Sequence, residues 1–268
     1  MAKTMRERLR ATAKSPLAGD PGERLGLLDK LSTAPLSQEH VERLSVLQNH
    51  VWGEHRRSVL LVLQGLDAAG KDGTIRYVFT GVNPQGCRVV SFKAPNEVEA
   101  EHDFLWRVHR VCPRDGEIGI FNRSHYEDVV TTFVLGLIDA KEREARLRMI
   151  RDFEHLLVSQ GTTIVKVFLH ISKEEQRRRL QARIDDPEKR WKFNTADLDT
   201  RESWNQYQKA YSEVIAATST DEAPWFVVPA DHKWVRNYAV SGLMVEVLEE
   251  LKPKLPPDPP GVAGTIVV

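Results

Sequence analysis

Apolar residues along the chain follow two patterns. In five short stretches nearly every residue is apolar and many are β-branched, which is typical of strands buried on both faces of a sheet. Elsewhere apolar residues recur every three or four positions, the spacing of one helix face. The continuous runs predict strands at 58–64, 88–92, 117–121, 163–171 and 225–229.

The stretches with helical spacing lie between these predicted strands. Ser37 is placed to cap an earlier one, whose apolar positions run from Val41 to Val51. Because strands and helices alternate, the pattern predicts an α/β fold with a central parallel sheet and helices on both faces. Further helices are expected at about 74–80, 97–110, 141–159, 173–184, 201–217 and 234–251.

The two ends of the chain lack both patterns. Residues 1–35 are rich in glycine, proline and charge, so we expect an arm before a single domain at 36–252. An arm is favoured over an Arg-rich transit peptide, and no secretory signal is expected. Residues 253–268 are proline-rich and should lie extended. No apolar run approaches the ~18 residues of a membrane span, so no membrane partner is expected.

Composition adds little about partners. The 268 residues include 38 Lys plus Arg and 38 Asp plus Glu, so an anion-binding surface must arise from segregation of charge. Cys87 and Cys112 are too few for a disulfide framework or a zinc cluster and are interpreted as packing residues. A reducing compartment, the cytoplasm, is therefore expected.

The first predicted strand leads into a glycine loop, "VLQGLDAAGKDGT". Gly65, Gly70 and Lys71 fit the P-loop pattern G-x-x-x-x-G-K-[ST], but Asp72 stands where the pattern has a hydroxyl. Such a loop, between a strand and a helix, cradles phosphate on its backbone N–H groups. The alternative is a structural turn with a surface lysine. Phosphate or nucleotide contacts are expected from Ala68, Ala69, Gly70, Asp72, Gly73 and Thr74.

The missing hydroxyl raises the question of what binds the metal. Magnesium prefers oxygen ligands, often one or two carboxylates with waters and substrate phosphates. Asp67 lies inside the loop, where a carboxylate would repel phosphate unless a divalent cation lay between them. We therefore expect Asp67 to bind the metal, with Asp72 as the other candidate. The alternative for Asp67 is an Asx-turn residue.

A second group of polar residues follows the third predicted strand, in "GEIGIFNRSHYEDV". Ligands of α/β sheets bind at the carboxyl ends of strands, so these side chains should face the phosphates. Asn122 replaces the usual Walker B aspartate, which leaves Asp67 and Asp128 as the expected metal ligands. Arg123 can clamp phosphate oxygens, and Glu127 should lie nearby.

The same stretch also has structural interpretations. Ser124 and Glu127 have the spacing of a helix capping box. His125 is interpreted as a structural histidine in preference to a general base. Lys93, which follows the second predicted strand, should also lie near the phosphates.

A basic segment, "SKEEQRRRLQARIDDPEKRWKF", follows the fourth predicted strand. Ordinary i,i+4 pairs can account for Arg178, Arg179 and Arg190. Arg177 and Arg183 have no acidic residue four positions before them. We therefore expect a mobile helical lid at about 173–197, broken near Pro187. The alternatives are a solvated helix face and nucleic-acid binding, which the P-loop disfavours.

Taken together, the chain resembles the polyphosphate kinase 2 family and its class III subgroup. The resemblance covers about 59–234. It rests on "GLDAAGKDGT", "NPQGCRVVSFKAP", "FNRSHYEDV", "FLHISKEEQRRRLQARIDDPEKRWKF" and "TSTDEAPWFVVPADHKW", which occur in this order.

The resemblance implies a thymidylate-kinase-like P-loop fold, a three-layer α/β arrangement with a lid. It implies phosphate transfer between inorganic polyphosphate and nucleotides with Mg²⁺ or Mn²⁺. Asn122 looks like the class III form, so AMP and ADP are the implied acceptors and ATP the final product; a homo-oligomer, dimer or tetramer, is also expected. By motif, the active-site residues would be Asp67, Lys71, Asn122, Arg123 and Asp128, with lid contacts from Arg177, Arg178 and Arg183.

Two other functions share parts of this pattern. An ATP-dependent mononucleotide kinase would use the same loop and lid, and a nucleotide- or polyphosphate-binding sensor would bind without turnover. A nucleotide phosphate is largely ionised near neutrality, with a second pKa of about 6, so its oxygen needs no general base to attack. Alignment of donor and acceptor and neutralisation of charge are then the main tasks of the protein.

Overall fold

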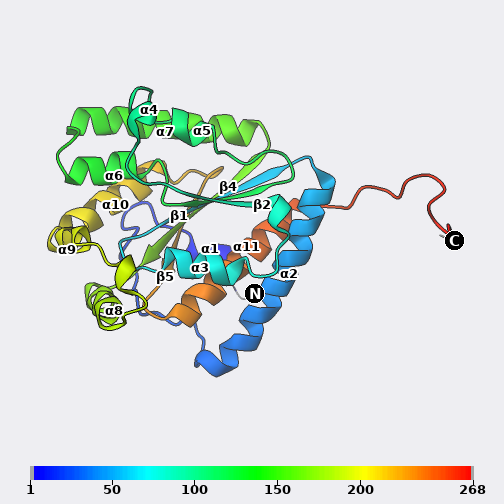
Figure 1. Cartoon of the computed structure of the whole chain (residues 1–268), viewed down its shortest axis with the longest axis horizontal. Helices are drawn as coiled ribbons and strands as arrows, with labels where there is room; N and C mark the ends of the chain where they lie inside the picture. The colour runs from blue at the N-terminus through cyan, green and yellow to red at the C-terminus, as the bar shows by residue number, and fades with distance from the viewer. Residues whose placement is uncertain (1–2, 267–268) are drawn as a thin grey trace.

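The computed structural model describes residues 3–266 and contains one five-stranded sheet (Figure 1). All neighbouring strands are parallel, in the order β2-β3-β1-β4-β5. This confirms the predicted parallel sheet, with strand boundaries within one residue of those expected. The strands are β1 Ser58–Gln64, β2 Cys87–Ser91, β3 Ile118–Asn122, β4 Thr162–His170 and β5 Trp225–Pro229.

The central strand, β1, explains why its sequence is continuously apolar. All seven of its residues are buried, and Leu61 pairs with Ile120 of β3 and Val165 of β4. A strand flanked by other strands and covered on both faces has no solvent-facing side. Because the strands are parallel, their carboxyl ends meet at one edge of the sheet.

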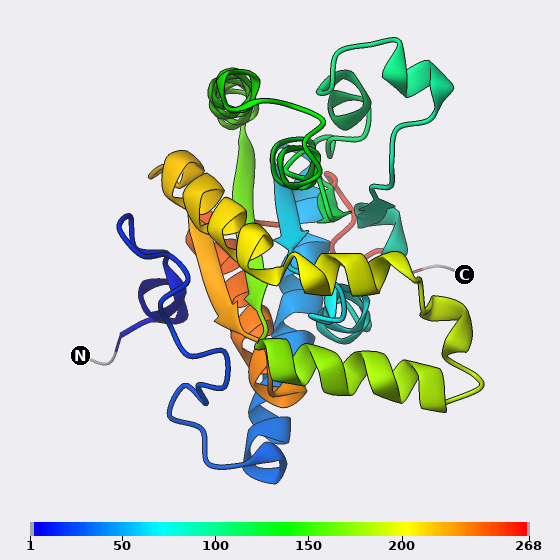
Figure 2. The same cartoon turned by 90° about the vertical axis from the view of Figure 1, so that its left-hand side faces the viewer.

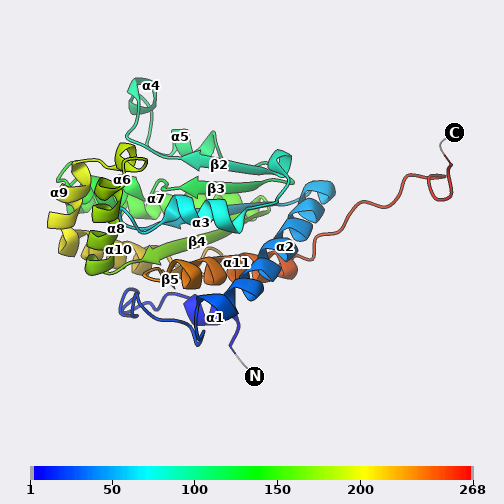
Figure 3. The same ribbon diagram turned by 60° about the horizontal axis from the view of Figure 1, so that its bottom comes forward.

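Helices cover both faces of the sheet, as predicted. Helices α6, α7 and α10 pack together on one face, and α2, α3 and α11 on the other (Figures 1 and 3). Helices α8, α9 and part of α10 lie beyond the carboxyl ends of the strands (Figure 2). The longer helices are α2 Lys30–Glu54, α3 Lys71–Val78, α6 Glu127–Val134, α7 Ala140–Ser159, α8 Lys173–Asp185, α9 Ala196–Glu202, α10 Trp204–Thr218 and α11 Lys233–Leu251. Single turns of 3-10 helix occur at Pro84–Gly86 and Arg190–Lys192.

The predicted helix at 97–110 is wrong, because two short helices replace it. They are α4 Glu97–Ala100 and α5 Trp106–His109. Between them the carboxylate of Asp103 accepts hydrogen bonds from the backbone N–H groups of Leu105 and Trp106, at 3.0 and 3.1 Å. An aspartate that binds its own downstream backbone competes with the helical pattern.

Helix α2 begins earlier than predicted. Asp29 caps it by accepting a hydrogen bond from the backbone N–H of Ser32 at 2.9 Å. Ser37, the expected cap, is a buried residue inside the helix, so that prediction is wrong. The helix ends at His55, in the left-handed conformation, close to the predicted end.

Part of the N-terminal arm is docked on the body of the protein. Helix α1, Met5–Leu9, packs against α11, and Met5 and Leu9 are buried. The N–H of Ala11 donates to the carbonyl of Trp225 in the edge strand β5 at 2.9 Å. The C-terminal tail, in contrast, extends away from the body (Figure 1). Within residues 3–266, no helix combines the length and apolarity needed to span a membrane.

Candidate active site

The glycine loop joins β1 to α3, the arrangement that the P-loop pattern requires. Helix α3 begins at Lys71, three residues before the predicted start, with Gly70 as its N-cap. Gly70 has φ +105° and Ala68 has φ +63°, so the loop backbone is left-handed at both positions. A Cβ on Gly70 would lie 1.9 Å from Nη1 of Arg236. A side chain at position 70 would therefore displace the Arg236 guanidinium and would strain the backbone at this φ, which favours glycine.

The P-loop lysine is folded back over this loop. Nζ of Lys71 donates to the carbonyl oxygens of Gly65 at 2.6 Å and Leu66 at 3.4 Å. Burial, followed by the nearby Arg123, lowers the pKa of Lys71 to about 8. The ammonium is thus held against the loop backbone, where Asp67, Glu127 and Asp72 offset only part of the effect of burial on its pKa.

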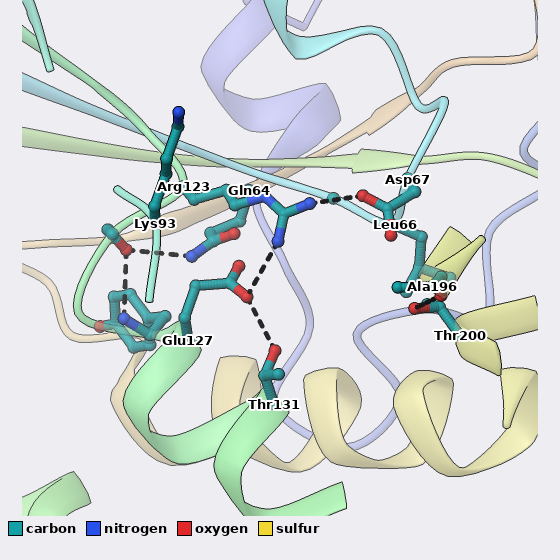
Figure 4. A network of polar contacts seen from close by, with 12 residues as sticks. Gln64, Leu66, Asp67, Lys93, Arg123, Glu127, Thr131, Ala196 and Thr200 are labelled. Atoms are coloured by element: carbon teal, nitrogen blue, oxygen red, sulfur yellow. Dashed lines mark hydrogen bonds and ion pairs between the residues drawn. The ribbon is translucent and has the colours of Figure 1, made fainter. Parts of the chain in front are cut away.

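Asp67 and Arg123, predicted from separate motifs, form an ion pair. Oδ1 of Asp67 lies 2.5 Å from Nη2 of Arg123, and Glu127 lies 3.6 Å from Nη1 (Figure 4). Burial alone would lower the pKa of Arg123, but Glu127 and Asp67 raise it above its usual value. Arg123 has φ +62°, a conformation that turns the chain sharply after β3. The loop and the end of β3 therefore meet as the sequence predicted.

A second contact between the same two segments involves Asn122 and Asp72. Nδ2 of Asn122 donates to Oδ1 of Asp72 at 2.7 Å. The residue in the Walker B position thus faces the residue that replaces the P-loop hydroxyl. The amide neutralises no charge, but it fixes the carboxylate of Asp72.

Asp128 lies in a different environment from Asp67. Its carboxylate is buried and bound by Nη2 of Arg107, at 3.0 Å to Oδ2 and 3.4 Å to Oδ1. Nη1 of Arg107 also donates to the carbonyl oxygen of Lys93 at 2.8 Å. Burial raises the pKa of Asp128 despite the arginine. Through Arg107, Asp128 is tied to the 93–107 segment, and its role as a metal ligand stays a prediction.

Ser124 and His125, which follow β3, are both buried. Oγ of Ser124 accepts from the N–H of Tyr126 at 3.2 Å, and α6 begins at Glu127 without a side-chain cap, so the capping-box interpretation is wrong. His125 is buried, with Nε2 3.5 Å from Glu154. This placement agrees with a structural histidine.

In the predicted lid, Arg177 and Arg183 pair with acidic residues, although neither has one four positions before it. Arg177 pairs with Glu174 three positions before it, at 2.7 Å, and Arg183 pairs with Asp197 of α9 at 3.5 Å. Neither contact has the i,i+4 spacing, because one is i,i+3 and the other reaches a different helix. Arg178 pairs with Glu175.

The break in the lid is where the sequence places it. Helix α8 ends at Asp185, two residues before Pro187. Beyond the break, Asp186 pairs with Lys189, while Nε of Arg190 donates to the carbonyl of Ile184 at 2.7 Å. The expected pair between Asp186 and Arg190 is therefore replaced by the pair between Asp186 and Lys189.

A cavity of about 440 Å³ opens beside the loop, between α6, α9 and α10. Most of its lining comes from residues 194–211, which the sequence analysis did not single out. One feature of the sequence could have indicated this wall: Tyr207 and Tyr211 are four residues apart, so they lie on one face of the predicted helix at 201–217. The polar and aromatic lining consists of Asp67, Arg123, Glu127, Thr131, Asn194, Asp197, Asp199, Thr200, Ser203, Tyr207 and Tyr211.

Comparison with known proteins identifies the family. A family model described as Polyphosphate kinase 2 (PPK2) matches residues 29–256, most of the chain. The chain belongs to the polyphosphate kinase 2 family. The resemblance drawn from the motifs is thereby confirmed.

Curated relatives of this polyphosphate kinase 2 chain carry specific names. It is 55% identical over 214 residues to the AMP/ADP-polyphosphate phosphotransferase of Meiothermus ruber, covering 80% of each chain. It is 47% identical to the ADP-polyphosphate phosphotransferase of Rhodopseudomonas palustris, covering 84% of this chain and 82% of the relative. The first name agrees with the class III resemblance.

A solved polyphosphate kinase 2 confirms the fold. The crystal structure of the enzyme from Arthrobacter aurescens TC1 superposes with a TM-score of 0.94 at 43% identity, covering 98% of this chain and 95% of that one. The two chains therefore share one overall fold over nearly their whole length.

Proposed function

We propose that this polyphosphate kinase 2 transfers the terminal phosphate of inorganic polyphosphate to AMP and ADP, giving ADP and ATP. The observation that carries the proposal is the cavity beside the phosphate loop. Asp67 of that loop and Arg123, which follows β3, both line the cavity. A nucleotide in that cavity would present its phosphate to a phosphate chain bound at the loop. The names of the curated relatives support the same donor and acceptors.

The residues can promote an in-line transfer. An oxygen of the acceptor phosphate forms a bond to the terminal phosphorus, the bond to the bridging oxygen breaks, and the shortened polyphosphate leaves with that oxygen. Near neutrality the attacking oxygen is already ionised, so the site needs no general base. Lys71 and Arg123 are placed to stabilise the charge on the transferred group.

The loop also fits a divalent cation, Mg²⁺ or Mn²⁺. No cluster of three or more acidic, histidine or cysteine residues suited to a metal exists among the described residues, but Mg²⁺ commonly takes only one or two carboxylates together with phosphate oxygens and waters. Asp67 would hold it. When bound, the metal neutralises phosphate charge. Arg123, which pairs with Asp67 in this structure, would then be released toward the phosphates.

We further propose that residues 173–197 form the lid. The side chains of Arg177 and Arg178 are 55% and 66% exposed, so each can exchange its glutamate for phosphate at small cost. Arg183, through Asp197, connects the lid to the cavity wall. A cytoplasmic homo-oligomer stays a prediction.

The test uses purified protein with polyphosphate, AMP and Mg²⁺, with products separated by chromatography. ADP should appear first and ATP later, and a parallel reaction with ATP and AMP but no polyphosphate should be much slower. Lys71→Ala and Asp67→Ala should abolish turnover while the circular dichroism spectrum stays unchanged. Absence of ADP and ATP in the first reaction would refute the proposal.

A further inference from the structure

Arg179, on α8, has every donor of its guanidinium engaged. Arginine carries five N–H donors in a fixed planar fork, and five acceptors surround this one while its side chain is only 10% exposed. The acceptors are Oε1 of Glu175 at 2.7 Å and the carbonyl oxygens of Ala68 at 3.0 Å, Ala69 at 2.9 Å, Ala230 at 2.6 Å and Asp231 at 2.9 Å.

Two of these acceptors belong to the phosphate loop. In a trans peptide the C=O and N–H point in opposite directions, so holding the Ala69 carbonyl on Arg179 directs the N–H of Gly70 the other way. Ala68, held by the same Nη1, is in the left-handed region, which costs a non-glycine residue about 1–3 kcal/mol. Arg179 therefore stabilises a strained loop conformation with its peptide planes in a fixed orientation.

The remaining acceptors tie this loop to two other elements. Ala230 and Asp231 follow β5 and precede α11, while Glu175 lies on α8 itself. Gln176, which is also on α8, donates from Nε2 to the carbonyl oxygen of Asp67 in the loop at 3.1 Å. The base of the predicted lid and the phosphate loop are thus joined by two side chains, of which Arg179 makes more of the contacts.

We propose that Arg179 is a positioning residue for the reaction: it sets the peptide orientation of the phosphate loop and couples that loop to the lid helix, without itself binding phosphate. The proposal rests on the proposed function in treating the loop as the polyphosphate site. A lysine could not replace it, because an ammonium has three donors and no planar fork.

The test compares Arg179→Lys and Arg179→Gln with wild type, at a temperature where all are folded. Arg148→Gln is the matched control, since Arg148 forms an exposed i,i+4 pair with Glu144. Tripolyphosphate binding is measured by calorimetry, and kcat and KM for polyphosphate by product analysis. We expect both Arg179 variants to lose about a hundredfold in kcat/KM and to bind tripolyphosphate more weakly, while the control keeps wild-type values.

A second measurement separates geometry from stability. Arg179→Ala should regain activity in millimolar guanidinium but not in ammonium, because only guanidinium reproduces the fork. Wild-type kcat, KM and tripolyphosphate affinity in Arg179→Lys would overturn the positioning role. Failure of the wild-type protein to bind tripolyphosphate would overturn the proposed function as well, so the two failures are distinguishable.

Discussion

The residues proposed to handle phosphate each have a partner inside the protein. Lys71 donates to Gly65, Arg123 pairs with Asp67, and the amide of Asn122 holds Asp72. On the proposed function, ligand binding would exchange these contacts for phosphate and metal contacts. Of these contacts, only the one between Arg123 and Asp67 balances opposite charges, since Lys71 and Asp72 are held by neutral partners.

Lys71 should make phosphate binding depend on pH. Its pKa is lowered to about 8, chiefly by burial, and only the ammonium attracts phosphate. Tripolyphosphate affinity should therefore fall as pH rises through about 8. Calorimetry across this range should show the loss in wild type, whereas the weak residual binding of Lys71→Ala should stay flat. A flat wild-type profile would argue against this role.

The same pKa has a consequence for stability, with the opposite sign. The unfolded lysine, at 10.5, binds its proton more tightly than the native one. Between about pH 8 and 10.5 the unfolded state holds more protons, so the contribution of Lys71 to the free energy of unfolding rises with pH.

Asn122→Asp should make the protein sensitive to divalent cations. A carboxylate at position 122 would face that of Asp72, replacing a 2.7 Å hydrogen bond with repulsion. We expect a loss of about 1 kcal/mol, or a Tm lower by about 2–4 °C, in a chelator, and recovery with Mg²⁺. Asn83→Asp is the control, because an aspartate there can still accept from the N–H of Gln85. An equal effect in both variants would count against the explanation.

At the scale of elements, a buried ion pair joins β4 to the helices on one face. Nζ of Lys166 donates to Glu154 of α7 at 2.5 Å, to the Thr218 carbonyl of α10 at 2.7 Å and to the Tyr126 hydroxyl at 3.1 Å. Burial alone would raise the pKa of Glu154, but Lys166 and His125 lower it below its usual value. The pair fixes how α7 and α10 pack on the sheet.

Lys166→Met should test this junction. It leaves Glu154, only 3% exposed, without its main cation, and breaking a buried pair in this way costs about 3–5 kcal/mol. Urea denaturation should show that loss. The double variant Lys166→Met with Glu154→Gln removes both charges and should recover much of it. A single variant within about 1 kcal/mol of wild type would show that the pair contributes little.

At the scale of the whole molecule, the N-terminal segment completes the edge of the sheet. Glu246 of α11 accepts from the N–H groups of Met5 at 2.7 Å and Arg6 at 2.9 Å, capping α1 from a distant element. Arg10 forms an antiparallel bridge with Phe226 of β5. The segment therefore covers an edge strand that would otherwise expose unpaired backbone groups.

Glu246→Ala should release this segment. Loss of two charge-assisted hydrogen bonds at a helix N-terminus should cost about 1–2 kcal/mol and make residues 3–28 susceptible to limited proteolysis, while kcat stays unchanged because the loop is untouched. Glu249→Ala, which removes an exposed pair with Arg43 at 2.9 Å, is the control and should have little effect. Resistance to protease equal to wild type would contradict the docking role.

The sequence alone determined the features that depend on residues close together along the chain. Continuous apolar runs located the five strands, and the spacing of Gly65, Gly70 and Lys71 located the phosphate loop, because burial and covalent spacing act locally. The sequence pattern failed at 97–110, where the Asp103 side chain accepts from the backbone N–H of Leu105. It also placed the cap of α2 at Ser37, eight residues after the actual cap, Asp29.

Only the tertiary structure decided which charged groups meet. Three arginines of α8 are adjacent in sequence, yet Arg177 and Arg178 face solvent while Arg179 reaches the loop. The cavity wall at 194–211 and the partner of Asp128 were likewise fixed by packing. Such contacts join segments that are distant along the chain, so their geometry depends on how the sheet and helices come together and not on any local pattern.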